Sequence, residues 1–142
     1  MNNRMYLKIK AIPENVGFIR NVVAAFSISV DPSLETINDV KTAISEAVTN
    51  SVVHGYKDKE GDVSVDAEII DTKLYIKITD QGAGIEDVEK AMEDFYTTET
   101  EEERSGLGFT IMKTYMDTLK VESKVGAGTT VLMTKELAHV DR

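Results

Sequence analysis

Cysteine is absent from the sequence, and its absence excludes several kinds of protein. Without thiols the chain can form no disulfide scaffold, no thiolate metal site and no cysteine nucleophile, so a reducing, cytoplasmic location is expected. Proline and glycine are also scarce, with 2 and 9 residues among 142, whereas 42% of the residues are hydrophobic. This composition is typical of a packed protein and not of a disordered one. The length predicts one domain over residues 1–142.

The sequence also lacks a long apolar run and an excess of basic residues. A membrane-spanning helix needs about 18 to 20 apolar residues in succession, and residues 1–10 contain alternating lysines where a signal peptide would be uniformly apolar. Neither membrane insertion nor secretion is therefore expected. The 16 Lys and Arg residues are outnumbered by 25 Asp and Glu residues, which gives a net charge of −9. Because such a charge repels phosphates at long range, direct binding of nucleic acid is not expected.

Hydrophobic periodicity predicts a mixture of strands and helices. Alternating apolar and polar residues, the pattern of a half-buried strand, occur over residues 5–11, 63–69, 74–79, 119–123 and 129–137. Apolar residues at helical spacing predict helices over residues 13–29, 33–54 and 106–116, with a short helix over 86–93. Residues 97–105 are polar and acidic and predict a mobile loop. The predicted class is α+β, with a mixed, mostly antiparallel sheet and helices on one face.

A glutamate and an asparagine lie four residues apart on the second predicted helix. Glu46 and Asn50 leave the same helix face, one turn apart, away from the apolar stripe. A solvated helix surface is the commoner explanation of such a pair. The functional interpretation is that Asn50 offers an amide oxygen to Mg²⁺ while Glu46 takes a proton from an attacking hydroxyl or water. One protein ligand suffices, because Mg²⁺ commonly takes further oxygens from phosphates and water.

Residues 80–84 (DQGAG) follow the third predicted strand and allow two interpretations. They could be a glycine-rich turn that closes the strand. Alternatively, Asp80 lies at a pocket rim and accepts a hydrogen bond from the exocyclic amine of a base. Because a carboxylate can only accept, such a site favours adenine over guanine. Gly82 and Gly84 would let the main chain pass close to the ring.

Two further glycine pairs are each weak signals. Residues 105–109 (SGLGF) open a predicted helix, where free N–H groups and the helix dipole form a phosphate site, although a flexible helix entry explains them equally. Residues 126–130 (GAGTT) read most simply as a hairpin turn, from which Thr130 could hold Asp80 or a bridging water. Neither His54 nor His139 is assigned a role.

The order of these motifs resembles the GHKL ATPase superfamily of gyrase B, heat-shock chaperones, histidine kinases and MutL. The resemblance covers essentially the whole chain and implies the Bergerat fold, a two-layer α/β sandwich that binds ATP or ADP with Mg²⁺. It makes residues 46–50 the N box, 80–84 and 106–108 the first two glycine boxes, 126–130 the third, and 85–105 the ATP lid. The residues it assigns to the nucleotide are Asn50, Asp80, Gly82, Gly84, Arg104, Ser105, Gly106, Leu107, Gly108 and Thr130, with Asn50 also the metal ligand and Glu46 the catalytic base.

Within the superfamily, residues 46–55 (EAVTNSVVHG) resemble those of the anti-sigma factor serine kinases. That resemblance implies a homodimer that holds a sporulation sigma factor inactive and phosphorylates a serine of an anti-anti-sigma factor. A histidine kinase would need a dimerisation hairpin with an acceptor histidine before the N box, where this chain already has its predicted strand and helix. Gyrase-like clamps carry transducer domains after the ATPase module, and here the sequence ends with the predicted sheet.

Two arginines are candidates for contacts with the nucleotide or with partners. Arg104, at the end of the lid, is the best cation to sense a γ-phosphate, although a surface arginine among glutamates is the simpler interpretation. Arg20, among Phe18, Ile19 and Val22, could contact partners or a second copy, although core burial explains most of that surface. The alternatives to a serine kinase are a nucleotide-gated binding module without catalysis and a stand-alone histidine-kinase-like catalytic domain.

Overall fold

The computed structural model describes residues 2–56, 59–93 and 101–138, and for residues 101–106 it describes the main chain alone. The elements in chain order are β1 (Asn2–Lys10), α1 (Glu14–Ser27), the short 3-10 helix η1 (Ile28–Val30), α2 (Leu34–Thr49), the π-helical turn η2 (Asn50–Gly55), β2 (Asp62–Ile70), β3 (Lys73–Asp80), α3 (Val88–Ala91), α4 (Glu101–Tyr115), β4 (Thr118–Lys124) and β5 (Gly128–Glu136). No helix in these ranges is both long and apolar enough to cross a membrane.

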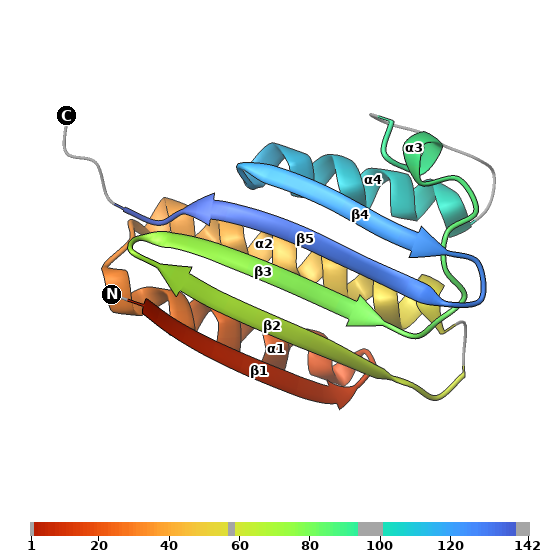
Figure 1. Cartoon of the computed structure of the whole chain (residues 1–142), viewed down its shortest axis with the longest axis horizontal. Coiled ribbons are helices and arrows are strands. Elements are labelled where there is room, and N and C mark those ends of the chain that lie inside the picture. The colour runs from red at the N-terminus through yellow and green to blue at the C-terminus, as the bar shows by residue number, and fades with distance from the viewer. Residues whose placement is uncertain (1, 57–58, 94–100, 139–142) are drawn as a thin grey trace.

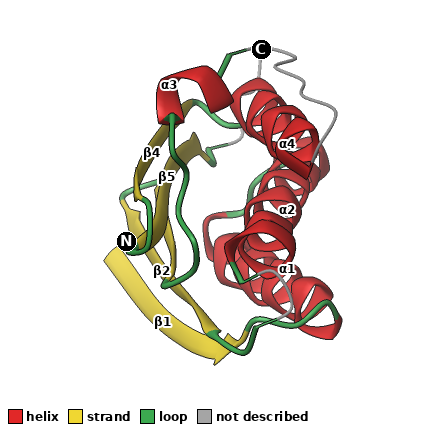
Figure 2. Cartoon of the chain, turned by 90° about the vertical axis from the view of Figure 1, so that its right-hand side faces the viewer, coloured by secondary structure: helices red, strands yellow, loops and turns green. Residues whose placement is uncertain are grey.

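One five-stranded sheet forms the first layer, in the order β1-β2-β3-β5-β4 with every neighbouring pair antiparallel (Figure 1). Helices α1, α2 and α4 form the second layer over one face of the sheet, as Figure 2 shows. The predicted α+β class, with helices on one face of a mostly antiparallel sheet, is confirmed. The five predicted strands are all present, with ends that differ by a few residues from the sequence pattern.

The alternating apolar residues of β2 and β3 form the sheet side of the hydrophobic core. The helix-facing residues of β2 are fully buried, and β3 repeats the pattern as far as Asp80. A two-residue turn joins the strands, and its first residue, Asp71, has φ 58°, a conformation that aspartate tolerates better than most residues. The resulting register pairs Asp80 with Val63. Asp80 is therefore a charged residue at the end of an otherwise apolar buried row.

Helix α2 is the central helix of the second layer. Its N-terminus is capped by Ser33, whose Oγ accepts a hydrogen bond of 3.1 Å from the N–H of Thr36. Its buried stripe comprises Val40, Ala43, Ile44, Ala47 and Val48. The helix passes directly into η2, which ends at Gly55, so the predicted helix end near residue 54 is confirmed, but the last turn is π-helical. Such wide turns occur frequently at functional sites.

The predicted start of α4 is wrong. This helix begins at Glu101, whereas the glycine pattern predicts a start at Gly106. Glu101, Glu102 and Glu103 occupy its first turn, where negative charge is favoured by the positive end of the helix dipole. The polar segment that predicts a mobile loop is thus helical from Glu101 onward, and its earlier residues, up to 100, lie outside the described part.

Lys135 on β5 links three elements. Its Nζ donates a 2.6 Å hydrogen bond to the carbonyl of Tyr115, at the end of α4, and lies 3.3 Å from Asp39 Oδ2 on α2. Only 15% of the Lys135 side chain is exposed. We expect Lys135→Met to lower the free energy of unfolding by about 1–3 kcal/mol, because a partly buried charged hydrogen bond is lost and Asp39 loses its counter-charge. Urea denaturation measures this change.

Lys120 provides the matched control for that substitution. It pairs with Glu122 at 3.2 Å, but its side chain is 71% exposed. Exposed ion pairs contribute little, so Lys120→Met is expected to leave stability within about 0.5 kcal/mol of the wild type. Equal losses of unfolding free energy in the two variants would show that the contacts of Lys135 stabilise the fold no more than an exposed ion pair does.

Candidate functional site

Asp80 is a buried carboxylate with its oxygens already oriented. Its residue is 4% exposed. Ser51 Oγ, on η2, donates to Asp80 Oδ2 at 2.9 Å, and the N–H of Gly82 donates to Oδ1 at 2.9 Å. Burial raises the pKa of the Asp80 carboxyl, and the hydrogen bonds from Gly82, Ser51 and the main chain of Thr129 oppose that rise. Protein donors thus fix the carboxylate at the rim of the core and leave it able to accept further hydrogen bonds.

The loop after Asp80 lies directly against η2. The N–H of Ala83 donates to the carbonyl of Gly55 at 2.6 Å. A Cβ on Gly82 would lie 2.1 Å from that same carbonyl oxygen. Gly84 has φ +78°, and a Cβ on it would lie 2.2 Å from the carbonyl oxygen of Lys124. Both glycines are therefore required by the main chain itself, which supports the interpretation of residues 80–84 as more than a simple turn.

Gly82→Ala is expected to destabilise the loop. The added methyl group meets a main-chain oxygen that cannot rotate away, and overpacking of this kind costs about 1–3 kcal/mol. Urea denaturation measures the loss. The control is Gly17→Ala on α1, where the added Cβ meets only the flexible end of Arg20 at 3.2 Å and where alanine favours the helix. A Gly82→Ala protein as stable as the Gly17→Ala protein would contradict the close approach.

Glu46 and Asn50 lie at the same end of the molecule as Asp80. Glu46 is on the last turn of α2, and Asn50 begins η2. A Cβ on Gly108 of α4 would lie 3.2 Å from both Asn50 amide atoms and 3.4 Å from Glu46 Oε2. A cavity of about 30 Å³ lies between the strands and these helices. Its lining includes Asn50, Ser51, His54, Asp80, Gly84 and Thr129. The structure thus brings the predicted base-binding and metal-binding residues together.

Asn50 fits the role of a metal ligand. Its Nδ2 atom is buried and is the one buried side-chain N or O atom in the described part of the chain that has no hydrogen-bond partner. A buried amide without a partner is costly unless a ligand satisfies it, and the amide can present either its oxygen or its nitrogen after a flip. Within the described ranges no three His, Cys, Asp or Glu residues gather as a metal site. A magnesium ion held by Asn50 would therefore take its other ligands from phosphates and water.

The predicted phosphate site at Gly106 and Gly108 does not lie at a helix N-terminus. Because α4 begins at Glu101, the N–H groups of Gly106 and Gly108 lie inside the helix and not at its N-terminus, where free N–H groups are found. Leu107 is 41% exposed, whereas Gly108 is buried against Asn50. The side chains of Arg104 and Ser105 lie outside the described part, so their roles stay predictions.

Thr130 is also misplaced by the sequence interpretation. It pairs with Thr79, on the face of the sheet opposite to Asp80. Its neighbour Thr129 pairs with Asp80 and lines the cavity. The prediction that Thr130 holds Asp80 is therefore wrong by one residue, because adjacent residues on a strand point to opposite faces.

Arg20 lies outside this cavity, in the layer of helices. Its Nη1 is 3.4 Å from Ser45 Oγ on α2, and the residue is partly buried. Ser45 precedes Glu46, so the guanidinium reaches the turn of α2 that carries the predicted base. On the same helix, Phe18 is 50% exposed. The predicted partner-binding role of Arg20 is neither supported nor contradicted by these contacts.

Two residues that build the site are not predicted by the sequence. Ser51 donates to Asp80, and Gly55 accepts from Ala83 and lies close to Gly82. In the sequence, Gly55 only follows the end of the helix predicted over residues 33–54. A contact between η2 and a loop about thirty residues later is tertiary, and no local pattern encodes it.

Comparison with known proteins places this chain in a family. Residues 9–135 match the family described as histidine kinase-like ATPase domain. A protein of Caldanaerobacter subterraneus named anti-sigma F factor is 54% identical over 97% of this chain and 96% of its own length. A protein of Clostridium acetobutylicum with the same name is 50% identical over 99% of both chains.

A solved structure gives an independent comparison of the fold. The crystal structure of the RsbU and RsbW domains of a Mycobacterium tuberculosis protein matches with a TM-score of 0.70 at 18% identity, over 99% of this chain and 34% of that one. Together with the family match, this likeness confirms the two-layer fold that the resemblance implied.

Proposed function

The chain belongs to the histidine kinase-like ATPase domain family, and from that premise we propose that it is an anti-sigma factor and an ATP-dependent protein serine kinase. In this proposal it binds and inhibits a sporulation sigma factor and phosphorylates a serine of the corresponding anti-anti-sigma factor. The support for the first activity is the name anti-sigma F factor carried by relatives about half identical over nearly their full length. The support for the second is the pocket.

The observation that carries the kinase proposal is the position of Glu46. Its carboxylate and the amide of Asn50 both border Gly108, while Asp80 faces the same cavity as Asn50. A binding module needs the base-recognising carboxylate and the metal ligand, but it does not need a second carboxylate beside the metal ligand. Glu46 therefore favours an enzyme over a nucleotide-gated module.

Each residue has a distinct role in the proposed reaction. Asp80 accepts a hydrogen bond from the 6-amino group of adenine. Asn50 would hold Mg²⁺, which would supply neutralisation of the charge on the phosphates. Glu46 accepts the proton of the substrate serine hydroxyl as its oxygen forms a bond to the γ-phosphorus. The bond from that phosphorus to the bridging oxygen breaks, and ADP leaves. Positioning supplies most of the catalysis in such transfers.

In this proposal, the small size of the cavity couples nucleotide binding to partner binding. Its volume of about 30 Å³ is far below the roughly 300–1,000 Å³ of small-molecule pockets. A nucleotide therefore displaces some of the residues around it. Gly108 on α4 lies close to two of the site residues, since a Cβ on it would be 3.2 Å from the Asn50 amide and 3.4 Å from Glu46 Oε2. Displacement of α4, which packs against α2, would change the helical surface available to partners. In this proposal that surface serves the sigma factor and the homodimer.

The experiment that tests the proposal uses the full chain with ATP labelled on its γ-phosphate. The chain is incubated with Mg²⁺ and a purified anti-anti-sigma factor, and we expect label on a serine of that protein and none without Mg²⁺. In parallel, size-exclusion chromatography with a sporulation sigma factor is expected to show an ATP-dependent complex of a homodimer. ATP-dependent sigma binding without any transferred label would leave the nucleotide-gated module as the function, and label on a histidine would indicate a histidine-kinase-like domain.

A further inference from the structure

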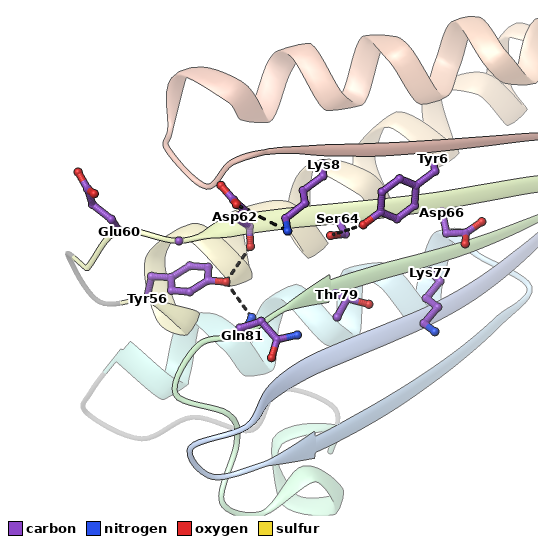
Figure 3. Close-up of a pocket in the computed structure, with 11 residues that line it drawn as sticks. Tyr6, Lys8, Tyr56, Glu60, Asp62, Ser64, Asp66, Lys77, Thr79 and Gln81 are labelled. Carbon is purple, nitrogen blue, oxygen red and sulfur yellow. Dashed lines mark hydrogen bonds and ion pairs between the residues drawn. The ribbon is translucent and has the colours of Figure 1, made fainter.

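Tyr56 is a buried tyrosine that directly follows η2. It is 7% exposed, and its ring lies against Gly61, where a Cβ would come within 2.1 Å of the ring atom Cε1. This glycine leaves room for the ring beside the start of β2. Figure 3 shows the phenol pointing from the end of the helical layer toward the ends of β2 and β3.

The phenol oxygen uses both its donor and its acceptor capacity on the main chain. It donates to the carbonyl of Asp62 at 2.7 Å and accepts from the N–H of Gln81 at 2.8 Å, the two bonds that Figure 3 marks around it. Asp62 is the first residue of β2, and Gln81 immediately follows Asp80. One side chain thus ties the end of η2 to the residue next to the buried carboxylate.

The contact made by Tyr56 is one of three between the same two segments. Ser51 binds the Asp80 side chain, and Gly55 binds the N–H of Ala83. Tyr56 supplies the link between them, at residue 81. These three bonds fix the position of the loop against η2. The direction of the Asp80 carboxylate therefore depends on all of them.

We propose that Tyr56 is a positioning residue for the nucleotide base, acting through the main chain of Gln81 on the carboxylate of Asp80. The proposal rests on the proposed function, because it takes the base to bind at Asp80. Hydrogen bonds to a base amine need a donor–acceptor distance of about 2.7–3.2 Å. Without the phenol oxygen, the N–H of Gln81 and the carbonyl of Asp62 lose their shared partner, and the loop relaxes away from that distance.

Tyr56→Phe removes this oxygen and keeps the ring. The measurement is the Kd of the full chain, by isothermal titration calorimetry with Mg²⁺, for ATP and for purine riboside triphosphate, which lacks the 6-amino group. We expect the Kd for ATP to rise about tenfold, the equivalent of one hydrogen bond of ordinary strength. The Kd for the analogue is expected to change less than about twofold, because this ligand does not use the acceptor at Asp80.

Tyr6→Phe is the matched control. Tyr6 lies on the exposed face of the same sheet, and its hydroxyl donates to Ser64 Oγ at 3.1 Å (Figure 3). This variant is expected to bind both nucleotides like the wild type. Gly61→Ala is the second test variant, because it keeps the Tyr56 oxygen but forces the ring aside, and it is expected to repeat the selective loss of ATP binding.

Each outcome decides the matter. Selective loss of ATP binding in the Tyr56→Phe protein, or in the Gly61→Ala protein if Tyr56→Phe does not fold, supports the proposal. Equal weakening of ATP and the analogue, or no weakening of either, overturns it, because a merely structural tyrosine cannot distinguish the two ligands. A wild-type chain that binds no ATP at all overturns the proposed function itself. A wild-type chain that prefers ATP to the analogue supports base recognition at Asp80, and the variants then decide the role of Tyr56 alone.

Discussion

Glu46→Gln is expected to reduce phosphate transfer to the substrate serine by about 10²- to 10⁴-fold, the contribution typical of a general base. Glutamine has the shape of glutamate and can still hydrogen-bond to the hydroxyl, but it cannot take up the proton. Binding of Mg-ATP is expected to stay within about twofold of the wild type, because Asp80 and Asn50 are untouched. Single-turnover transfer of labelled phosphate measures the first quantity, and calorimetry measures the second.

Glu35→Gln is the control for that substitution, because Glu35 is an exposed glutamate in the first turn of the same helix. We expect it to transfer phosphate at the wild-type rate. Full ATP binding together with lost phosphate transfer in the Glu46→Gln protein would show that Glu46 acts in catalysis and not in nucleotide binding. Transfer that continues at the wild-type rate in the Glu46→Gln protein would remove Glu46 from the mechanism and return the nucleotide-gated module as the better function.

The sequence predicts the sheet and the long helices well because their signals are local. Alternation in β2 and β3 reflects one buried face, and the stripe from Val40 to Val48 reflects one helix face packed on it. Asp80 stands out for the same reason, since a charged residue occupies the next buried position of an apolar row. The pairing of Glu46 with Asn50 likewise needs only helical geometry.

The parts that the sequence does not predict depend on contacts between distant segments or on competing local preferences. Nothing around Ser51 or Tyr56 shows that their hydroxyls meet residues 80 and 81. Thr129 and Thr130 are the same residue type in adjacent positions, so only the strand register decides which one faces Asp80. At the start of α4, acidic residues that favour a helix N-terminus compete with glycines that favour a loop, and the helix prevails from Glu101.

Asp80→Asn is expected to weaken ATP binding by about 10- to 100-fold. The asparagine occupies the same volume, and its oxygen can accept the hydrogen bond from Gly82 while its amide donates to Ser51 Oγ. With the oxygen committed in this way, the amide presents a donor to the 6-amino group of adenine, and donor faces donor. A charged hydrogen bond is lost and a mismatch is added, which together cost about 1.5–3 kcal/mol. Calorimetric titration with Mg-ATP measures the loss, and affinity within about twofold of the wild type would refute base recognition by Asp80.

The same substitution is expected to raise stability at neutral pH, because function and folding make opposite demands on this carboxylate. Burial raises the pKa of Asp80 in the folded chain above the ordinary value of 3.8. The folded state therefore binds its proton more tightly than the unfolded state does, so the wild type loses stability as pH rises from about 3.8 through the raised pKa. Asparagine has no charge to bury and avoids this loss. Urea denaturation across that pH window should show that the free energy of unfolding of the Asp80→Asn protein increases relative to that of the wild type as pH rises. A difference that does not change with pH would show that burial does not raise the pKa of the Asp80 carboxyl.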